Sequence, residues 1–264
     1  MAADPTDSLV PGADPWAAPP ADPWAGLRAF TAARIALGRT GTSVPLGEAL
    51  AFRLAHAHAR DAVYSALETD RLLAELRALH QPVGLVRSRA ESRPHYLQRP
   101  DLGRQLNEES RRRLADSAPG AADIALILAD GLSATAINEH ALPVLRLLVP
   151  RLRQAGFTLA PLTLALQARV AISDEIGAAL RARLALILIG ERPGLSAPDS
   201  LGAYFTYAPR PGLTDEARNC VSNIRPTGLP YEAAAEKLFF LLSEALRSKL
   251  SGVPLKDETG RLGE

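Results

Sequence analysis

Long apolar runs that end at glycine or charged residues divide the C-terminal half of the chain into short buried segments. The clearest run is Leu184–Ile189, in which six apolar residues stand without interruption before Gly190 and Glu191. A run of this length predicts a strand that is buried on both faces, as in parallel sheets. Ile124–Ala129 has the same pattern, and Thr158–Leu166 is a third candidate. These runs predict the inner strands of a parallel sheet.

Helical spacing fills the gaps between the predicted strands. Residues 134–155 are predicted to be helical, with interruptions near their two prolines. Ser173 is predicted to cap a short helix whose first turn carries two carboxylates, and Pro230 begins a closing helix that ends at Gly252. Strands and helices that alternate with short connections predict the α/β class, with a Rossmann-like parallel sheet flanked by helices.

The N-terminal half follows a different pattern. Residues 1–21 are rich in proline, alanine and aspartate and lack periodicity, which predicts a disordered tail. Apolar residues then recur at helical spacing in several segments, beginning with a helix from Asp22 to Gly38. We therefore predict three parts: the tail, a mainly helical region at 22–118 and a Rossmann-like domain at 119–264.

Composition narrows the classes of function. The chain has 264 residues and 47% hydrophobic content, enough for a sizeable core. Its 30 basic and 29 acidic residues nearly cancel, which argues against a nucleic-acid binder. Cys220 is the single cysteine, so an intrachain disulfide and a multi-cysteine metal site are excluded. No run approaches the roughly 20 apolar residues of a membrane span, and no secretory signal is evident, so we expect a soluble cytoplasmic chain.

Polar segments follow each predicted inner strand and are expected to meet at one edge of the sheet. They are Asp130–Ser133, Gln167–Val170 and Gly190–Gly194. The carboxyl edge of an open α/β sheet is where ligands bind. The loop-rich residues 196–225 are long enough to fold across this edge as a lid or contact surface.

Candidate residues at this edge have both functional and structural interpretations. Glu191 is placed to contact a ligand, or else to pair with Arg192 or accept a loop hydrogen bond. Asp130 and Ser133 can present a hydroxyl and helix amides to an anion, or Ser133 caps its own helix. Cys220 is expected to be a small buried apolar residue rather than a reactive thiol.

Asp174 and Glu175 can act as an acid and base pair, although helix-start charges explain them more simply. The phosphate loop, the dinucleotide fingerprint and the nucleophile elbow are all missing from the sequence. The residues alone therefore indicate a module that binds a sizeable polar ligand and has no self-contained catalytic set.

Seven blocks in the chain carry a family resemblance, which covers about Trp24 to Glu258. They are RIALGRTG (Arg34–Gly41), YLQRPDLGR (Tyr96–Arg104), ADGLSA (Ala129–Ala134), DEIG (Asp174–Gly177), LIGERPGLSAPDSLGAYFTY (Leu188–Tyr207), RNCVSNIRPTGLPY (Arg218–Tyr231) and LSGVPLKDE (Leu250–Glu258). Together they resemble the small (light) subunit family of ethanolamine ammonia-lyase. The resemblance implies an adenosylcobalamin-dependent lyase that converts ethanolamine to acetaldehyde and ammonia. It also implies a large TIM-barrel subunit that binds ethanolamine, with cobalamin between that subunit and a Rossmann-like small subunit.

The resemblance implies three cobalamin contacts on this chain, at Val170, Glu191 and Cys220, and no catalytic or metal-ligating residue. The family often has glycine where this chain has Ala168. None of the five histidines lies in the Asp-x-His-x-x-Gly pattern that replaces the cofactor's own base, so base-on binding is predicted. The family further implies six large and six small subunits, either free in the bacterial cytoplasm or inside a protein-shelled microcompartment.

Two other hypotheses compete with the cobalamin-binding subunit. One is a stand-alone Rossmann-like enzyme that acts on a nucleotide or phosphate ester through Asp130 and Ser133. The other is a non-catalytic scaffold whose α/β domain binds nothing. The missing phosphate loop weighs against the first, and the polar residues at three adjacent strand ends weigh against the second.

Overall fold

A computed structural model describes residues 22–117 and 120–255, and the predicted tail at 1–21 lies outside this part. The chain divides between His56 and Ala57 into two compact units. The division falls within helix α1 (Leu46–Tyr64). The larger unit contains the whole sheet and every residue discussed below as part of a site.

In the N-terminal unit, the prediction of a helix from Asp22 to Gly38 is wrong. Only a short 3₁₀ helix, η1 (Ala25–Phe30), forms there. No residue from 22 to 56 is buried. An isolated helix of this length is marginal in water without an apolar surface to pack against, which the unit itself does not provide.

The larger unit is built on one sheet of six strands in the order β1-β3-β2-β4-β5-β6. The four strands β1, β3, β2 and β4 are mutually parallel, as predicted for the inner strands. Strands β5 and β6 extend the sheet in antiparallel pairing. The strand bounds are β1 Val83–Arg87, β2 Ala122–Ala129, β3 Leu162–Leu166, β4 Ala182–Gly190, β5 Leu201–Tyr207 and β6 Asn219–Ile224.

The prediction that residues 196–225 form a lid is wrong, because strands β5 and β6 lie in this segment. A Rossmann-like parallel sheet is not confirmed, because the sheet is partly antiparallel. The α/β class is confirmed, but the sheet is mixed because β5 and β6 lie within the predicted lid. In β6 only Val221 and Ile224 are buried, so that strand lacks the apolar run on which the prediction of inner strands depended.

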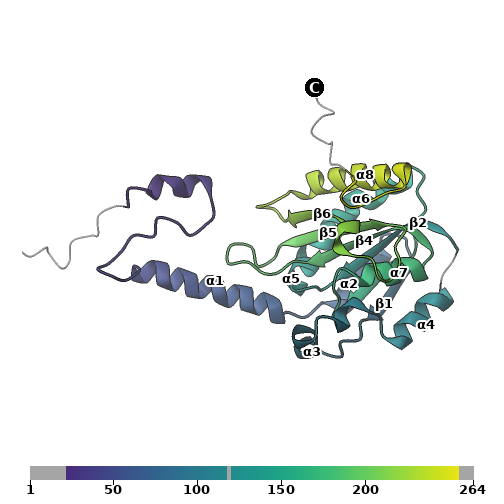
Figure 1. The fold of residues 1–264 in the computed structure, drawn as a ribbon, viewed down its shortest axis with the longest axis horizontal. Helices are drawn as coiled ribbons and strands as arrows, with labels where there is room; N and C mark the ends of the chain where they lie inside the picture. The colour runs from purple at the N-terminus through teal and green to yellow at the C-terminus, as the bar shows by residue number, and fades with distance from the viewer. Residues whose placement is uncertain (1–21, 118–119, 256–264) are drawn as a thin grey trace, which may run out of the picture. The chain divides into compact units, whose positions relative to one another are not determined.

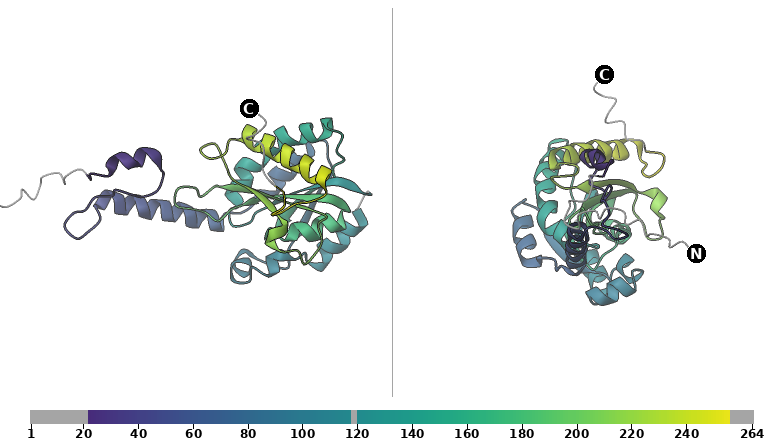
Figure 2. Two further views of the ribbon diagram at one scale, coloured as in Figure 1. Left: turned by 45° about the horizontal axis from the view of Figure 1, so that its top comes forward. Right: turned by 90° about the vertical axis from the view of Figure 1, so that its left-hand side faces the viewer.

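Helices cover both faces of the sheet (Figure 1). On one face lie α2 (Thr69–Arg77), α6 (Leu142–Gln154) and α8 (Tyr231–Ser248). On the other lie α4 (Glu108–Ser117) and α7 (Ile172–Ala179). The turned views keep α6 and α8 together on one side of the strands (Figure 2).

Alternation along the buried strands explains the two layers. In β4, Leu184, Leu186 and Leu188 face the core beneath α6 and α8, while Ile187 and Ile189 face the core beneath α7. Neighbouring side chains of a strand point to opposite faces, so a continuous apolar run fills both cores at once. The prediction that Leu184–Ile189 is buried on both faces is confirmed.

Details of the helices differ from the predictions. The run at 134–155 consists of α5 (Ala134–Ala136), a π-helical turn η3 (Ile137–Ala141) and α6. Ala171, rather than Ser173, occupies the N-cap of α7, and Ser173 lies inside the helix. Helix α8 ends at Ser248, before Gly252, because Lys249 takes a left-handed conformation.

Strand β1 comes from the region predicted to be mainly helical, and it pairs with β3. The sheet therefore includes strands from both sides of residue 118, where a domain boundary was predicted. The division into domains at this residue stays a prediction. Helix α3 (Arg93–Gln98) and the 3₁₀ helix η2 (Leu102–Arg104) follow β1 in the same region.

Candidate functional site

The loops after β2, β3 and β4 meet at the carboxyl edge of the parallel strands, as predicted. The Leu132 amide donates to the Gly190 carbonyl at 3.0 Å, which ties the loop after β2 to the end of β4. A Cβ atom at Gly131 would lie 2.2 Å from the Gly190 carbonyl oxygen, and one at Gly190 would lie 2.0 Å from that of Ser133. Glycine at both positions allows the two backbones to approach this closely.

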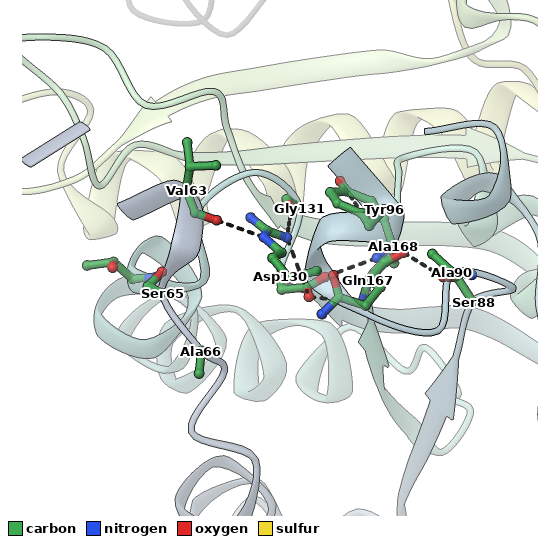
Figure 3. A network of polar contacts seen from close by, with 12 residues as sticks. Val63, Ser65, Ala66, Ser88, Ala90, Tyr96, Asp130, Gly131, Gln167 and Ala168 are labelled. Atoms are coloured by element: carbon green, nitrogen blue, oxygen red, sulfur yellow. Dashed lines mark hydrogen bonds and ion pairs between the residues drawn. The ribbon is translucent and has the colours of Figure 1, made fainter. Parts of the chain in front are cut away.

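Asp130 joins the ends of β2 and β3. Its carboxylate accepts hydrogen bonds from the amides of Gln167 at 2.9 Å and Ala168 at 3.0 Å (Figure 3). The Arg93 guanidinium lies 3.8 Å from Oδ2 of Asp130. Burial raises the pKa of Asp130, while these amides and Arg93 oppose the rise. Asp130 is only 3% exposed, so its role here is structural.

Ser133 is also fully buried, and it accepts a hydrogen bond from the Ala136 amide, so it caps its own helix. Its hydroxyl donates to the Pro198 carbonyl at 2.9 Å. Neither Asp130 nor Ser133 faces solvent. The structure therefore argues against an enzyme that acts on a nucleotide or phosphate ester through these two residues.

Ala168 fits its position without a glycine. It is not among the residues with positive φ, although Gln167 beside it has φ of 54°. Its amide donates to Asp130, and its carbonyl accepts from the Tyr96 hydroxyl at 3.1 Å. The backbone that leads to Val170 is therefore held in place with alanine at 168.

Two adjoining clefts open at this edge. Cleft A has a volume of about 390 Å³, and cleft B has a volume of about 300 Å³. They share Arg169, Val170 and Tyr204 in their walls. Cleft A is also lined by Tyr96, Gly131, Leu132, Ile189, Gly190, Glu191 and Arg192, and cleft B by Arg104, Ala171, Asp215, Arg218 and Cys220.

The structure thus brings the three predicted site residues around one region. Val170 lines both clefts, Glu191 lines cleft A and Cys220 lines cleft B. Two of these residues follow parallel strands, and Cys220 lies on β6 in the segment predicted to be a lid. The antiparallel strands therefore bring the third residue to the site.

Glu191 is half-buried and held by two donors. The Ser200 hydroxyl and the Asn223 amide both donate to its Oε2 atom, the amide at 3.2 Å. No ion pair joins it to Arg192 among the described residues, so of the structural alternatives the loop hydrogen bond is confirmed. The second carboxylate oxygen, Oε1, has no hydrogen bond to another described residue and is available to a ligand.

Tyr204 and Cys220 face each other across β5 and β6. Cys220 is exposed, so the prediction of a buried cysteine is wrong. Desolvation still raises the pKa of its thiol, although the Tyr204 hydroxyl lowers it in part. Desolvation and Cys220 also raise the pKa of Tyr204. Both groups are therefore neutral near pH 7, which makes Cys220 a polarizable contact surface rather than a thiolate nucleophile.

Three arginines at the clefts have no ion pair with another described residue: Arg104, Arg169 and Arg192. Burial raises the pKa of Tyr96 in the wall of cleft A to about 12, and the nearby Arg169 opposes that rise. Each guanidinium offers several N–H donors in a fixed plane. The clefts therefore combine acceptor, donor and apolar surfaces, which suits a ligand with many amide or phosphate oxygens.

Asp174 and Glu175 do not form an acid and base pair. The Asp174 carboxylate is paired with the Arg218 guanidinium, and both side chains are at most 3% exposed. Burial raises the pKa of Asp174 to about 6, and Arg218 opposes that rise. Glu175 accepts from the Leu106 amide and from Arg111. Both carboxylates therefore hold neighbouring segments against α7. These contacts add to the favourable position of the two charges at the start of a helix.

One group of donors in the described part of the chain can hold a metal ion: Glu139, His140 and Asp199. Both ring nitrogens of His140 already have partners, Tyr231 at 2.8 Å and Asp199 at 3.1 Å. We therefore describe this group as a hydrogen-bond network.

Several residues that shape the clefts or their surroundings are not evident from the sequence. Tyr204 lies in the segment predicted to be loop-rich, although Tyr204–Tyr207 is a run of residues with high strand propensity and is a usable signal. Ser200, His140 and the buried Arg218 carry no local pattern that relates them to Glu191 or Asp174.

Comparison with known proteins identifies the family of the chain. The family model described as "Ethanolamine ammonia-lyase light chain (EutC)" matches residues 21–256. The chain belongs to this family. Proteins named "Ethanolamine ammonia-lyase small subunit" are 57% identical in Azotobacter vinelandii, covering 88% of this chain and 87% of the relative, and 55% identical in Ralstonia nicotianae, with the same coverage. One from Xanthomonas campestris pv. campestris is 54% identical over 92% of this chain and 90% of the relative.

Membership of the light-chain family confirms the resemblance that the sequence blocks carry. The match extends over both compact units and includes every residue that lines clefts A and B. Within residues 22–117 and 120–255, no helix is long and apolar enough to cross a bilayer.

Proposed function

We propose that this chain is the cobalamin-binding small subunit of an ethanolamine ammonia-lyase. In this proposal clefts A and B form one side of an adenosylcobalamin site, and a large subunit forms the other. The observation that carries the proposal is that Val170, Glu191 and Cys220, which lie far apart in sequence, line two adjoining clefts. Membership of the light-chain family supports adenosylcobalamin as the ligand.

The dimensions of the clefts favour a site shared by two chains. Volumes of about 390 and 300 Å³ are at the lower end of those that enclose a small-molecule ligand. A corrin ring with its amide side chains and nucleotide loop is larger than either cleft. This chain can therefore cover one surface of the cofactor, and a second chain must exclude water from the rest.

The residues present match the chemistry of such a ligand. Val170 offers methyl groups to its apolar surface. The free oxygen of Glu191 can accept from a carboxamide N–H group, and Arg169 can donate to a carboxamide or phosphate oxygen. Cys220 is neutral and polarizable, so it can lie against the ring edge without adding charge. These groups bind and orient, and we assign no catalytic role to any of them.

When bound, adenosylcobalamin supplies the radical chemistry by homolysis of its cobalt–carbon bond. Ethanolamine is held by the large subunit in this proposal. The contribution of this chain is to fix the position of the cofactor and to close one side of the site to water.

Replacing Glu191 by alanine is expected to weaken adenosylcobalamin binding about tenfold in the complex with the large subunit, because a buried charge-assisted hydrogen bond is lost. Spectrophotometric titration of the purified complex measures this affinity. The matched control is Glu236→Ala, which removes an exposed carboxylate on α8 that lines neither cleft. Equal affinity for both variants and the parent complex would remove Glu191 from the site and favour a scaffold role.

We also propose that the cofactor binds base-on, because no histidine of this chain stands in the pattern that displaces dimethylbenzimidazole. Electron paramagnetic resonance of the cobalt(II) form of the complex, grown with nitrogen-15 histidine, is expected to show coupling to nitrogen-14 of the cofactor base. Coupling to nitrogen-15 would refute base-on binding.

For the assembly we propose six large and six small subunits in the bacterial cytoplasm, free or inside a microcompartment. Native mass spectrometry of the co-expressed complex gives the stoichiometry directly. A stable complex with any other ratio would contradict it.

A further inference from the structure

We propose that His140 is a positioning residue for the cofactor site, because it fixes residues Pro198–Ser200 and through them orients Glu191. His140 lines neither cleft, so it acts only through its neighbours. The last step of this inference, from Glu191 to the cofactor, rests on the proposed function. The earlier steps depend only on contacts within the larger unit.

His140 lies in the π-helical turn η3 and is 4% exposed. π-helical turns are rare and occur often at functional sites. The ring has one hydrogen-bond partner on each nitrogen, and Oε2 of Glu139 lies 3.9 Å from Nε2, beyond hydrogen-bond distance. Tyr231, the first residue of α8, places its hydroxyl 2.8 Å from Nδ1, and Asp199 places Oδ2 3.1 Å from Nε2.

The donors in this network can be assigned from the chemistry of the groups. The Asp199 carboxylate only accepts, so Nε2 of His140 carries the proton and donates. In the neutral ring Nδ1 is then the acceptor, and the Tyr231 hydroxyl donates to it. Every ring nitrogen is satisfied in this arrangement, and Asp199 is held by a buried donor.

Asp199 is the middle of three consecutive residues that are each held by a different partner. The Pro198 carbonyl accepts from the Ser133 hydroxyl at 2.9 Å. The Ser200 hydroxyl donates to Oε2 of Glu191, and the Glu191 amide donates to the Ser200 carbonyl at 2.9 Å. A contact at Asp199 is therefore one residue away from both bonds that join Ser200 to Glu191.

Without the His140 donor, Asp199 has no hydrogen bond to another described residue, and its side chain is already 27% exposed. We expect it to turn to solvent and to loosen Ser200. Glu191 would keep the Asn223 amide as a partner but would lose its fixed orientation. A charged side chain that is already fixed before the ligand binds loses less conformational entropy on binding, which raises the affinity. A Glu191 side chain without a fixed orientation is therefore expected to bind the ligand more weakly.

Two variants of His140 separate its two contacts. In His140→Gln the side-chain amide nitrogen reaches the place of Nε2 and can donate to Asp199. In His140→Asn the side-chain oxygen takes the place of Nδ1 and can accept from Tyr231, while the donor to Asp199 is lost. Both variants leave a polar side chain in the same pocket, so a general effect on folding would appear in both.

Hydrogen–deuterium exchange of the complex without cofactor tests the first step. His140→Asn is expected to speed exchange across residues 191–200 about tenfold, while His140→Gln stays close to the parent chain. Peptides from α7 serve as the internal control. Unchanged exchange in His140→Asn, or equal acceleration in both variants, would overturn the positioning role.

Titration with adenosylcobalamin tests the second step. His140→Asn is expected to weaken binding about fivefold in the parent background and not at all in the Glu191→Ala background. If Glu191→Ala weakens binding and His140→Asn does not, the inference is overturned. If Glu191→Ala itself has no effect, the proposed function of Glu191 fails, and the exchange experiment still decides whether His140 fixes the segment.

Discussion

Replacing Arg218 by methionine is expected to lower the free energy of unfolding by about 3–5 kcal/mol, because it leaves the Asp174 carboxylate buried without its counter-charge. Arg218 also donates to the carbonyls of Leu213 and Thr214 and so fixes the wall of cleft B. Denaturant unfolding of the purified chain, monitored by circular dichroism, measures this loss.

The double variant Arg218→Met with Asp174→Leu is the control. Replacing both members of a buried ion pair by apolar groups is often close to neutral, so it should recover most of the stability lost by Arg218→Met alone. If the double variant is as unstable as the single one, the loss comes from the carbonyl contacts of Arg218 rather than from the stranded carboxylate.

Replacing Gly190 by alanine is expected to cost about 3 kcal/mol or more. The new Cβ atom would lie 2.0 Å from the Ser133 carbonyl oxygen and 2.7 Å from that of Asp130, and both are backbone atoms that cannot move aside easily. The loop after β2 would separate from the end of β4, and Glu191 would move with it. Denaturant unfolding measures the stability, and cobalamin titration of the complex measures the effect on the site.

Gly194→Ala is the matched control, four residues further along the same segment. A Cβ atom there meets its nearest neighbour, the Ala197 carbonyl, at 3.8 Å, an ordinary contact. We expect a change within about 0.5 kcal/mol. A loss similar to that of Gly190→Ala would show that the close approach at Gly190 is not the cause of the effect.

Three of the four parallel strands, β2, β3 and β4, were predictable because a strand buried on both faces is a continuous apolar run in the sequence. Leu184–Ile189 and Ile124–Ala129 are continuous apolar runs, and both faces of each are covered. The order of these strands along the chain then determines which loops lie at the same edge of the sheet. The sequence alone therefore predicts that Glu191 and Val170 lie at one edge.

Strands β5 and β6 were not predictable by the same means. β6 is a polar strand with two buried residues, and its place depends on pairing with β5. Long-range pairs such as Asp174 with Arg218 and His140 with Asp199 join residues 44 and 59 positions apart. Contacts of this kind leave no local periodicity, so the position of Cys220 beside Val170 required the structure, and its proposed ligand came from the resemblance.

The most direct test of a cobalamin site shared by two chains is to titrate adenosylcobalamin into this chain, into the large subunit and into the complex of both. A site shared by two chains predicts tight binding by the complex alone, since clefts A and B cover only one side of the cofactor. Binding to the large subunit alone with the affinity of the complex would contradict a shared site.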